Sequence, residues 1–323
     1  MSEITQLEES TAVDEAFEED GLDSEESDAP VLVAPSELQP SCACGGKGAS
    51  CGCGGAKHDK AHLVYALGTV GYDFGSEARR DALVQQTGKN VANPRDFLEV
   101  LQGDPSLAAA VTWTLSLEAT VVYAIQPAGA FAETVYDRLR QFLQAQLSEG
   151  VERAAIPGRI RGTARLLNGQ AVPRIFPELR GLHDWSTPAL VQAVLGPAPT
   201  DSDAGAEHAQ RASAIGNFLE RIYYELRNLG TSPQDRALNF AATNAFQAGV
   251  VFSSAAQSGL QLDKIDVERS PACRPGADCW DVKLVFFNPA RRLEQARRVY
   301  RYTVDVSDVV PVTVGSLRSW DVY

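Results

Sequence analysis

Acidic residues are concentrated at one end of this chain, and this segregation decides which part of it can fold. Residues 1–40 hold thirteen Asp and Glu side chains, a single aromatic residue, Phe17, and no Lys or Arg. Such a segment cannot bury enough apolar surface to offset the chain entropy lost on folding. We therefore expect residues 1–40 to be a disordered acidic tail, which either keeps the protein in solution or docks on a basic surface, including its own folded part.

The other 283 residues carry 29 acidic and 29 basic side chains, so the formal charge of −13 belongs to the tail. A neutral folded part without a Gly/aromatic RNA-binding motif does not favour nucleic acid as a partner. The longest apolar runs, such as 121–125 and 248–252, are far shorter than the roughly 20 residues that span a bilayer. The polar start of the chain does not resemble a signal peptide. We expect a cytoplasmic protein that does not enter a membrane.

Four cysteines lie in a Gly-rich segment that follows the tail. Cys42, Cys44, Cys51 and Cys53 form two CxC pairs within residues 41–61, which we expect to be a hinge because so many glycines leave little to pack. Four thiolates could close a tetrahedral site around Zn(II). The usual zinc ribbon has CxxC pairs and a longer spacer. Free thiols in a hinge are therefore the simpler interpretation, and disulfides or modified cysteines are further alternatives.

From His62 onward the apolar pattern becomes that of a globular domain. Alternation over residues 111–118, with Trp113 and Leu115 on one side, predicts a half-buried strand. Apolar residues at helical spacing predict an amphipathic helix over 131–148. Other runs complete a first lobe, residues 62–195: strands at 62–70 and 121–125, helices at 75–86 and 94–101, and a hairpin turn at Asn168 and Gly169.

A stretch of small and turn-forming residues, 196–207, predicts a linker to a second lobe, residues 208–323. Helical spacing from Ile215 predicts a helix that ends at Gly230, and Ser232 is placed to cap a second helix that runs to about Gln257. Four strand-like runs follow at 260–268, 280–287, 297–306 and 309–317. We therefore predict an α+β protein of two lobes with mixed helices and strands, ending in an antiparallel meander packed on two long helices.

No catalytic constellation is recognisable. The histidines are His58, His62, His183 and His208, and none stands in a motif for nucleophilic, metal or nucleotide chemistry. His183 is followed by Asp184, but adjacency in sequence does not make a dyad. We name no catalytic residue and no protease machinery, and we expect that the protein is not an enzyme.

A second cysteine pair, Cys273 and Cys279, encloses a short loop between two predicted strands. A hairpin can bring its ends close enough for a disulfide, yet a reducing cytosol keeps most thiols free. We expect free thiols here, with a disulfide or a shared metal as alternatives.

Arginines gather before and within the third strand of the predicted meander. They are Arg291, Arg292, Arg297, Arg298 and Arg301. Guanidinium groups suit bidentate recognition of carboxylates. We assign these five as a candidate peptide-binding site for an acidic peptide, the tail included, although a solvated strand and turn explains them more simply.

Three stretches of the chain carry a family resemblance. Tyr65 to Asp81 (YALGTVGYDFGSEARRD), Trp113 to Glu118 together with Ile125 to Pro127, and Arg236 to Phe240 closely resemble the C-terminal region of the cyanobactin maturation proteases of the PatA and PatG type. The likeness continues through the final strands to Val306 and covers most of residues 62–323. It implies two consecutive appended domains with no assigned biochemical role, preceded by a cysteine-bearing linker.

The resemblance implies a setting, the biosynthesis of ribosomally made and modified peptides. The subtilisin-like protease of that family has no counterpart in residues 1–61, so the resemblance implies neither proteolysis nor macrocyclisation. We expect a non-catalytic accessory or recognition protein that holds a precursor peptide or a co-encoded maturation enzyme, with a homodimer as one arrangement. An enzyme of unrecognised type acting on a modified peptide is the alternative; it predicts a concave pocket with polar residues of perturbed pKa.

Overall fold

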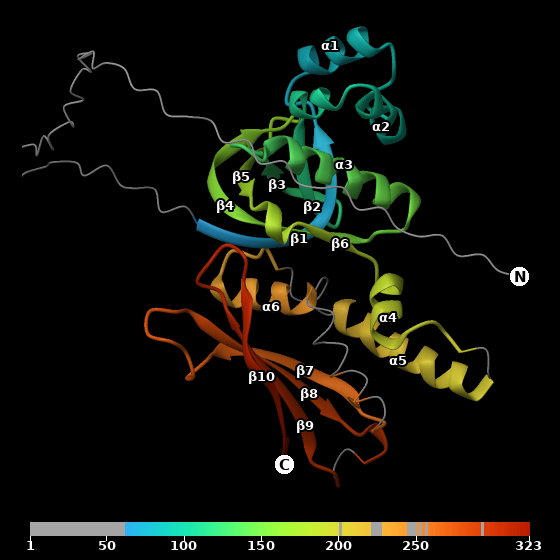
Figure 1. The fold of residues 1–323 in the computed structure, drawn as a ribbon, viewed down its shortest axis with the longest axis vertical. Helices are drawn as coiled ribbons and strands as arrows, with labels where there is room; N and C mark the ends of the chain where they lie inside the picture. Colours follow the sequence, from blue (N-terminus) through green and yellow to red (C-terminus); the bar gives the residue numbers. More distant parts are fainter. Residues whose placement is uncertain are drawn as a thin grey trace, which may run out of the picture. The chain divides into compact units, whose positions relative to one another are not determined.

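A closed barrel and a separate antiparallel sheet make up the part of the chain described by the computed structural model (Figure 1). The described residues are 62–199, 202–220, 228–243, 251, 254–255, 258–291 and 294–323. The predicted tail, hinge and CxC pairs lie outside them and stay predictions. The α+β class is confirmed. None of the helices in the described ranges combines the length and the apolar character needed to cross a membrane.

The barrel is built from five strands, which are β1 (His62–Asp73), β2 (Thr112–Leu117), β3 (Thr120–Ile125), β4 (Arg153–Arg165) and β5 (Ala171–Pro177). Their order is β1-β2-β3-β5-β4, and β1 pairs with β4 to close the ring. The β3–β5 pair is parallel and the others are antiparallel. Helix α3 (Ala132–Ser148) connects β3 to β4, and β6 (His183–Trp185) adds to the outer edge of β4. This is the strand order and helix position of the OB-fold, a five-stranded Greek-key barrel.

Strand β1 closes the barrel because it pairs on both of its edges in turn. Its first seven residues pair with β4, and residues 69–73 pair with β2. At the changeover stands Gly68, where an added Cβ would overlap the carbonyl oxygen of Ser116. Glycine is required there because the two strands approach too closely for any side chain.

The barrel core is filled from the long connection between β1 and β2 and from α3. That connection holds α1 (Glu77–Thr87), α2 (Pro94–Gly103) and the short η1 (Pro105–Ala110). Trp113 is fully buried, as the alternation predicted, and its indole N–H donates to the carbonyl of Ala108 at 2.8 Å. Phe97 of α2 and Phe142 of α3 are also fully buried in this cluster.

The second sheet has the order β10-β9-β8-β7 and is antiparallel throughout, so the predicted meander is confirmed. Its strands are β7 (Gln261–Arg269), β8 (Cys279–Phe287), β9 (Arg297–Asp305) and β10 (Val312–Val322). Helices α4 (Thr187–Leu195), α5 (Ser202–Glu220) and α6 (Pro233–Thr243) precede it. Helix α5 begins inside the stretch predicted as a linker. The prediction of two long helices beneath the sheet is not confirmed in the described residues.

Helix α6 packs against β1 on one side and against β7, β8 and β9 on the other. Tyr65 lies in the part of β1 that pairs with β4 along one edge, whereas β2 pairs along the other edge only from Thr69 onward. The backbone N–H of Tyr65 donates to Gly230 O at 2.9 Å, and its carbonyl accepts from Asn239 Nδ2 at 2.7 Å. Gly230 has a φ of +71°, and an added Cβ would overlap the Tyr65 carbonyl. Residues of the second lobe therefore complete the hydrogen bonding of the barrel strand.

Candidate functional site

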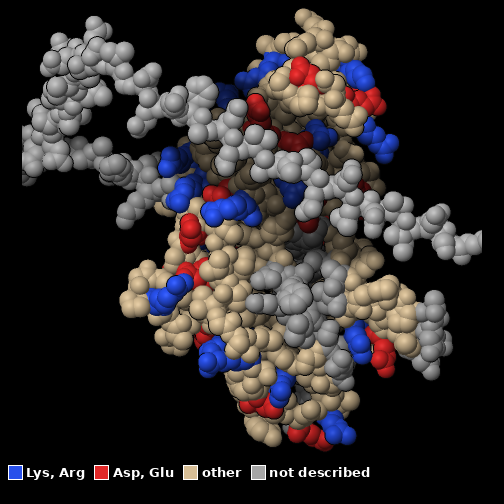
Figure 2. Space-filling model, viewed as in Figure 1, with Lys and Arg blue, Asp and Glu red and all other residues tan. Residues whose placement is uncertain are grey.

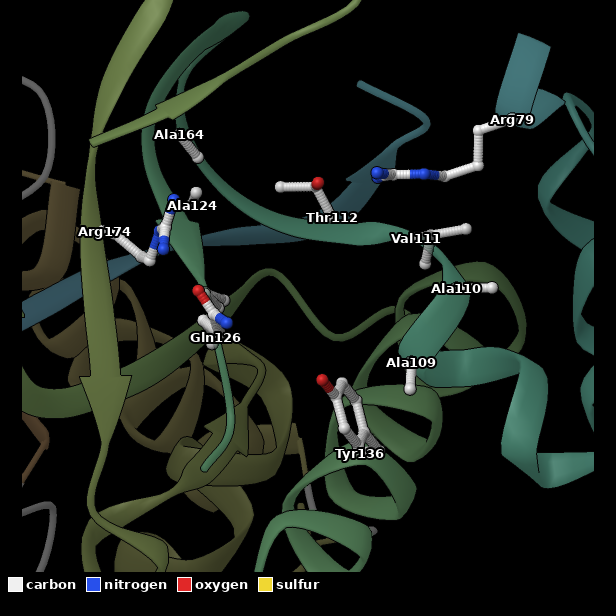
Figure 3. A pocket seen from close by; sticks show the side chains of 11 residues that line it. Arg79, Ala109, Ala110, Val111, Thr112, Ala124, Gln126, Tyr136, Ala164 and Arg174 are labelled. Carbon is white, nitrogen blue, oxygen red and sulfur yellow. The ribbon is translucent and has the colours of Figure 1, made fainter. Parts of the chain in front are cut away.

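A cavity of about 480 Å³ opens on the outer face of the barrel (Figure 3). Side chains alternate along β2 and β3, so Trp113 and Ile125 point into the core while Thr112 and Ala124 face outward. Together with Gln126, these outward residues form the floor. In an OB-fold this face of strands 2 and 3, with the loops after strands 1 and 4, is the surface that takes ligands.

Five other elements supply the walls of the cavity. Arg79 comes from α1, Tyr136 from α3, Ala164 from β4 and Arg174 from β5, and η1 adds Ala109 and Ala110. Arg174 lies beside Ala124 because β5 pairs with β3 in parallel. The site is therefore assembled from segments that are far apart in sequence.

One carboxylate fixes the two loops beside the cavity relative to each other. Asp73, the last residue of β1, accepts through Oδ1 from the backbone N–H of Gly75 at 2.6 Å and of Leu167 at 2.8 Å. Gly75 opens the turn into α1, and Leu167 belongs to the β4–β5 hairpin. Ser76 then caps α1 by accepting from the N–H of Arg79 at 3.3 Å.

Gly75 also makes room for the Arg79 side chain. Its φ of +71° lies in the left-handed region that favours glycine, and an added Cβ would stand 3.3 Å from Arg79 Nη1. The turn after β1 thus brings a guanidinium group to the edge of the barrel face.

The cavity is positively charged. Arg79 is exposed, and Arg174 is half-buried with Nη2 donating to Thr163 O at 2.7 Å. Among the described residues that line the cavity there is no Asp or Glu. The Tyr136 hydroxyl is protonated at neutral pH and can donate a hydrogen bond, and burial raises its pKa further above neutral. The arrangement suits an anion with several hydrogen-bond acceptors.

Three of the arginines predicted as a peptide-binding site, Arg297, Arg298 and Arg301, lie on the C-terminal sheet, each close to an acid of the same sheet. Arg298 contacts both carboxylate oxygens of Asp321, at 2.8 and 3.0 Å. The ion pair of Arg297 with Asp263 and that of Arg301 with Asp281 each span 3.3 Å. In Figure 2 basic and acidic side chains lie next to one another over this sheet.

These arginines do not converge on one point. Side chains alternate along β9, so Arg298 points to the face opposite that of Arg297 and Arg301. Arg291 ends a short 3-10 helix before the strand, and Arg292 lies outside the described residues. The five-residue site stays a prediction, and a peptide that binds there would have to compete with the sheet's own carboxylates.

Both halves of the folded part are similar to known protein domains. Residues 63–170 match the family model described as PatG Domain, and residues 205–320 match the one described as PatG C-terminal. A solved structure described as "PatG Domain of Unknown Function" is 42% identical in sequence, with a TM-score of 0.73. That match covers 81% of this chain and 100% of the other. The chain belongs to the PatG domain family. No curated protein matches it.

The PatG Domain match covers the motif that carried the resemblance, and the structure shows what this motif builds. Asp73, Gly75, Ser76 and Arg79 all fall within it and form the turn and wall described above. Arg79 could have been suspected from this capped turn after a strand. Arg174 could not, because only the β3–β5 pairing brings it to the same cavity.

The cysteine predictions have two outcomes in this PatG-domain chain. Cys273 and Cys279 form a disulfide with Cα atoms 5.6 Å apart, so the expectation of free thiols was wrong. The β7–β8 hairpin brings the two together, since Ser270 N donates to Cys279 O at 2.8 Å. The Zn(II) site at Cys42, Cys44, Cys51 and Cys53 stays a prediction. Within the described ranges, no group of three or more His, Cys, Asp or Glu side chains could hold a metal.

Proposed function

We propose that this PatG-domain protein is a non-catalytic recognition protein that holds a peptide during the biosynthesis of ribosomally made, modified peptides. The observation that carries the proposal is the cavity on the barrel face. Two guanidinium groups line it, and the described lining residues include no Asp or Glu. The setting comes from the family resemblance. The partner we favour is a precursor peptide rather than a co-encoded maturation enzyme, because a cavity of about 480 Å³ suits a short peptide segment and not a folded protein surface.

The chemistry of the lining supports binding over catalysis. A nucleophile needs an adjacent base, and general acid–base work needs a group that titrates near the working pH. The described lining offers Thr112 and Tyr136 hydroxyls, a Gln126 amide and the two arginines. The Tyr136 phenol, whose pKa burial raises further above its ordinary value of about 10, is a donor and not a base at neutral pH.

The same lining supports a peptide over a nucleic acid. Single-stranded nucleic acids bind through successive aromatic side chains on which their bases stack, within a long basic groove. Tyr136 is the one aromatic side chain among the described residues that line the cavity. Guanidinium, amide and hydroxyl donors instead match the carboxylates and carbonyls of a peptide.

The test is a calorimetric titration of the full chain with unmodified candidate precursor peptides. We expect saturable binding that Arg174→Gln weakens and Arg161→Gln does not; Arg161 is exposed on β4 and is not among the lining residues. The peptide mass should be unchanged after long incubation with the protein. Absence of binding by any such peptide, or a changed mass, would contradict the proposal.

A further inference from the structure

We infer that the cavity selects an acidic peptide segment that places one carboxylate on Arg174 and a second on Arg79. The inference rests on the proposed function and names the chemistry that the peptide must carry. It assigns each arginine a separate partner, and so differs from general attraction of negative charge.

The two guanidinium groups reach the cavity from different elements. In Figure 3 they approach from opposite sides, with Thr112 between them in that view. Arg79 is carried by α1 and Arg174 by β5. A single carboxylate can make a bidentate pair with one arginine. Two acidic groups, spaced along a chain, are needed to satisfy both.

Neither arginine has an ion-pair partner among the described residues. Elsewhere in the described chain, Arg297, Arg298 and Arg301 each have an acid within 3.3 Å. Both cavity arginines therefore keep the donors that a bidentate carboxylate needs, apart from the N–H that Arg174 gives to Thr163. A ligand can add these charge-assisted bonds without first breaking an internal pair.

The two arginines should contribute unequally. Arg174 is half-buried on a strand and is already held by the Thr163 carbonyl, so little side-chain freedom is lost when a ligand binds. Arg79 is exposed and must be ordered by the ligand. We expect the carboxylate on Arg174 to supply more of the affinity.

The neutral donors of the cavity suit a peptide backbone. Tyr136 and Gln126 both line the cavity, and a protonated phenol and an amide N–H can donate to peptide carbonyls. The ligand class is therefore a short peptide segment with two carboxylates. These come from two Asp or Glu side chains, or from one side chain and a C-terminal carboxylate.

A double-mutant cycle between protein and peptide tests the inference. The full chain is titrated by calorimetry with acetylated, amidated alanine peptides that carry two Glu residues at several spacings. The same peptides with either Glu or both replaced by Gln are titrated in parallel. One further series ends in a free C-terminal carboxylate in place of the second Glu, which distinguishes the two sources of the charge.

We expect the best two-Glu peptide to bind about 10-fold more tightly than the single-Glu form that lacks the partner of Arg174, and more tightly by a smaller factor than the form that lacks the partner of Arg79. Arg174→Gln should remove the gain from one Glu, and Arg79→Gln the gain from the other, because a cycle detects only groups that interact. Arg161→Gln should change neither. Raising the salt concentration should reduce the gain from both.

The inference is overturned if Gln peptides bind as tightly as Glu peptides, if none of the peptides binds, or if the two arginine variants lose the same Glu. It is also overturned if an oligothymidine binds the cavity more tightly than the best peptide. The Glu→Gln change is made in the peptide, so this readout holds even if an arginine variant fails to fold.

The outcome for the proposed function is separate. If a precursor peptide binds and its affinity is unchanged by Arg79→Gln and Arg174→Gln, the two-carboxylate inference fails while peptide recognition stands. If the Glu peptides show the expected cycle and no precursor peptide binds, the cavity assignment stands and the proposed function fails.

Discussion

The arginines of the barrel cavity and those of the C-terminal sheet are the same residue type in opposite situations. On the sheet, Arg298 and Arg301 have an acid at hydrogen-bond or ion-pair distance on a neighbouring strand. In the cavity, Arg79 and Arg174 have none among the described residues. A cluster of arginines in sequence is therefore a weaker sign of a binding site than arginines that the fold leaves without a carboxylate.

The largest effect on stability is expected from removing Asp281, the β8 acid that pairs with Arg301. Asp281 is fully buried, accepts from Thr303 Oγ1 at 2.6 Å and pairs with Arg301 at 3.3 Å. Asp281→Ala should lower the free energy of unfolding by about 3 kcal/mol, because it leaves a cation and a hydroxyl without their acceptor. Urea denaturation measures the loss. A loss as small as that of the exposed control Asp321→Ala would show that the sheet arginines are not held by their acids.

Breaking the disulfide should have the next largest effect, and only on the sheet side. Cys273 and Cys279 are six residues apart, and such a short closed loop contributes about 2 kcal/mol. Cys273→Ser with Cys279→Ser should lower the unfolding free energy by that amount. Affinity for the acidic peptides should be unchanged. A loss of peptide affinity in the still-folded variant would mean that the sheet takes part in binding.

A smaller effect is expected where the barrel meets the second lobe. Tyr123 of β3 donates its hydroxyl to Leu229 O at 2.9 Å. Tyr123→Phe should cost about 1 kcal/mol in urea denaturation at neutral pH. An unchanged unfolding free energy would show that this bond does not help to hold the two regions together.

The same tyrosine gives a pH dependence. Burial, followed by the nearby charge of Asp235, raises the pKa of Tyr123 to about 12. Because the folded pKa lies above the unfolded value of about 10, its contribution is present below pH 10 and is lost as the pH rises toward 12. Tyr123→Phe should make the decline of stability in this window shallower. An equal decline in both proteins would contradict the shift.

The smallest effect is expected at the exposed pair of the sheet. Arg298 and Asp321 are each more than a third exposed, and such pairs contribute little after solvent screening. Arg298→Ala should change the unfolding free energy by less than about 0.5 kcal/mol and leave peptide affinity unaltered, whereas Arg174→Gln should reduce that affinity. If Arg298→Ala weakens peptide binding, the arginine cluster predicted from sequence is a second recognition surface.

Local patterns predicted the elements better than they predicted the site. The alternation around Trp113 and the four terminal strand runs were readable because each depends on neighbours in sequence. Helix α5 was missed at its start, since Ser202 to Glu207 is rich in small and acidic residues that also suit a linker. The pairing of β3 with β5 joins residues far apart in the chain. No local sequence pattern could therefore predict that Arg174 and Arg79 line the same cavity.

The hydrogen bonds of Tyr65 to Gly230 and Asn239 bear on how this chain can be divided. Cutting between the barrel and the second lobe would expose the β1 backbone at Tyr65 and the Tyr65 ring to water. An exposed strand edge of this kind favours edge-to-edge aggregation. An expression fragment should therefore keep both, and in any larger polypeptide the pair is best transplanted as one piece.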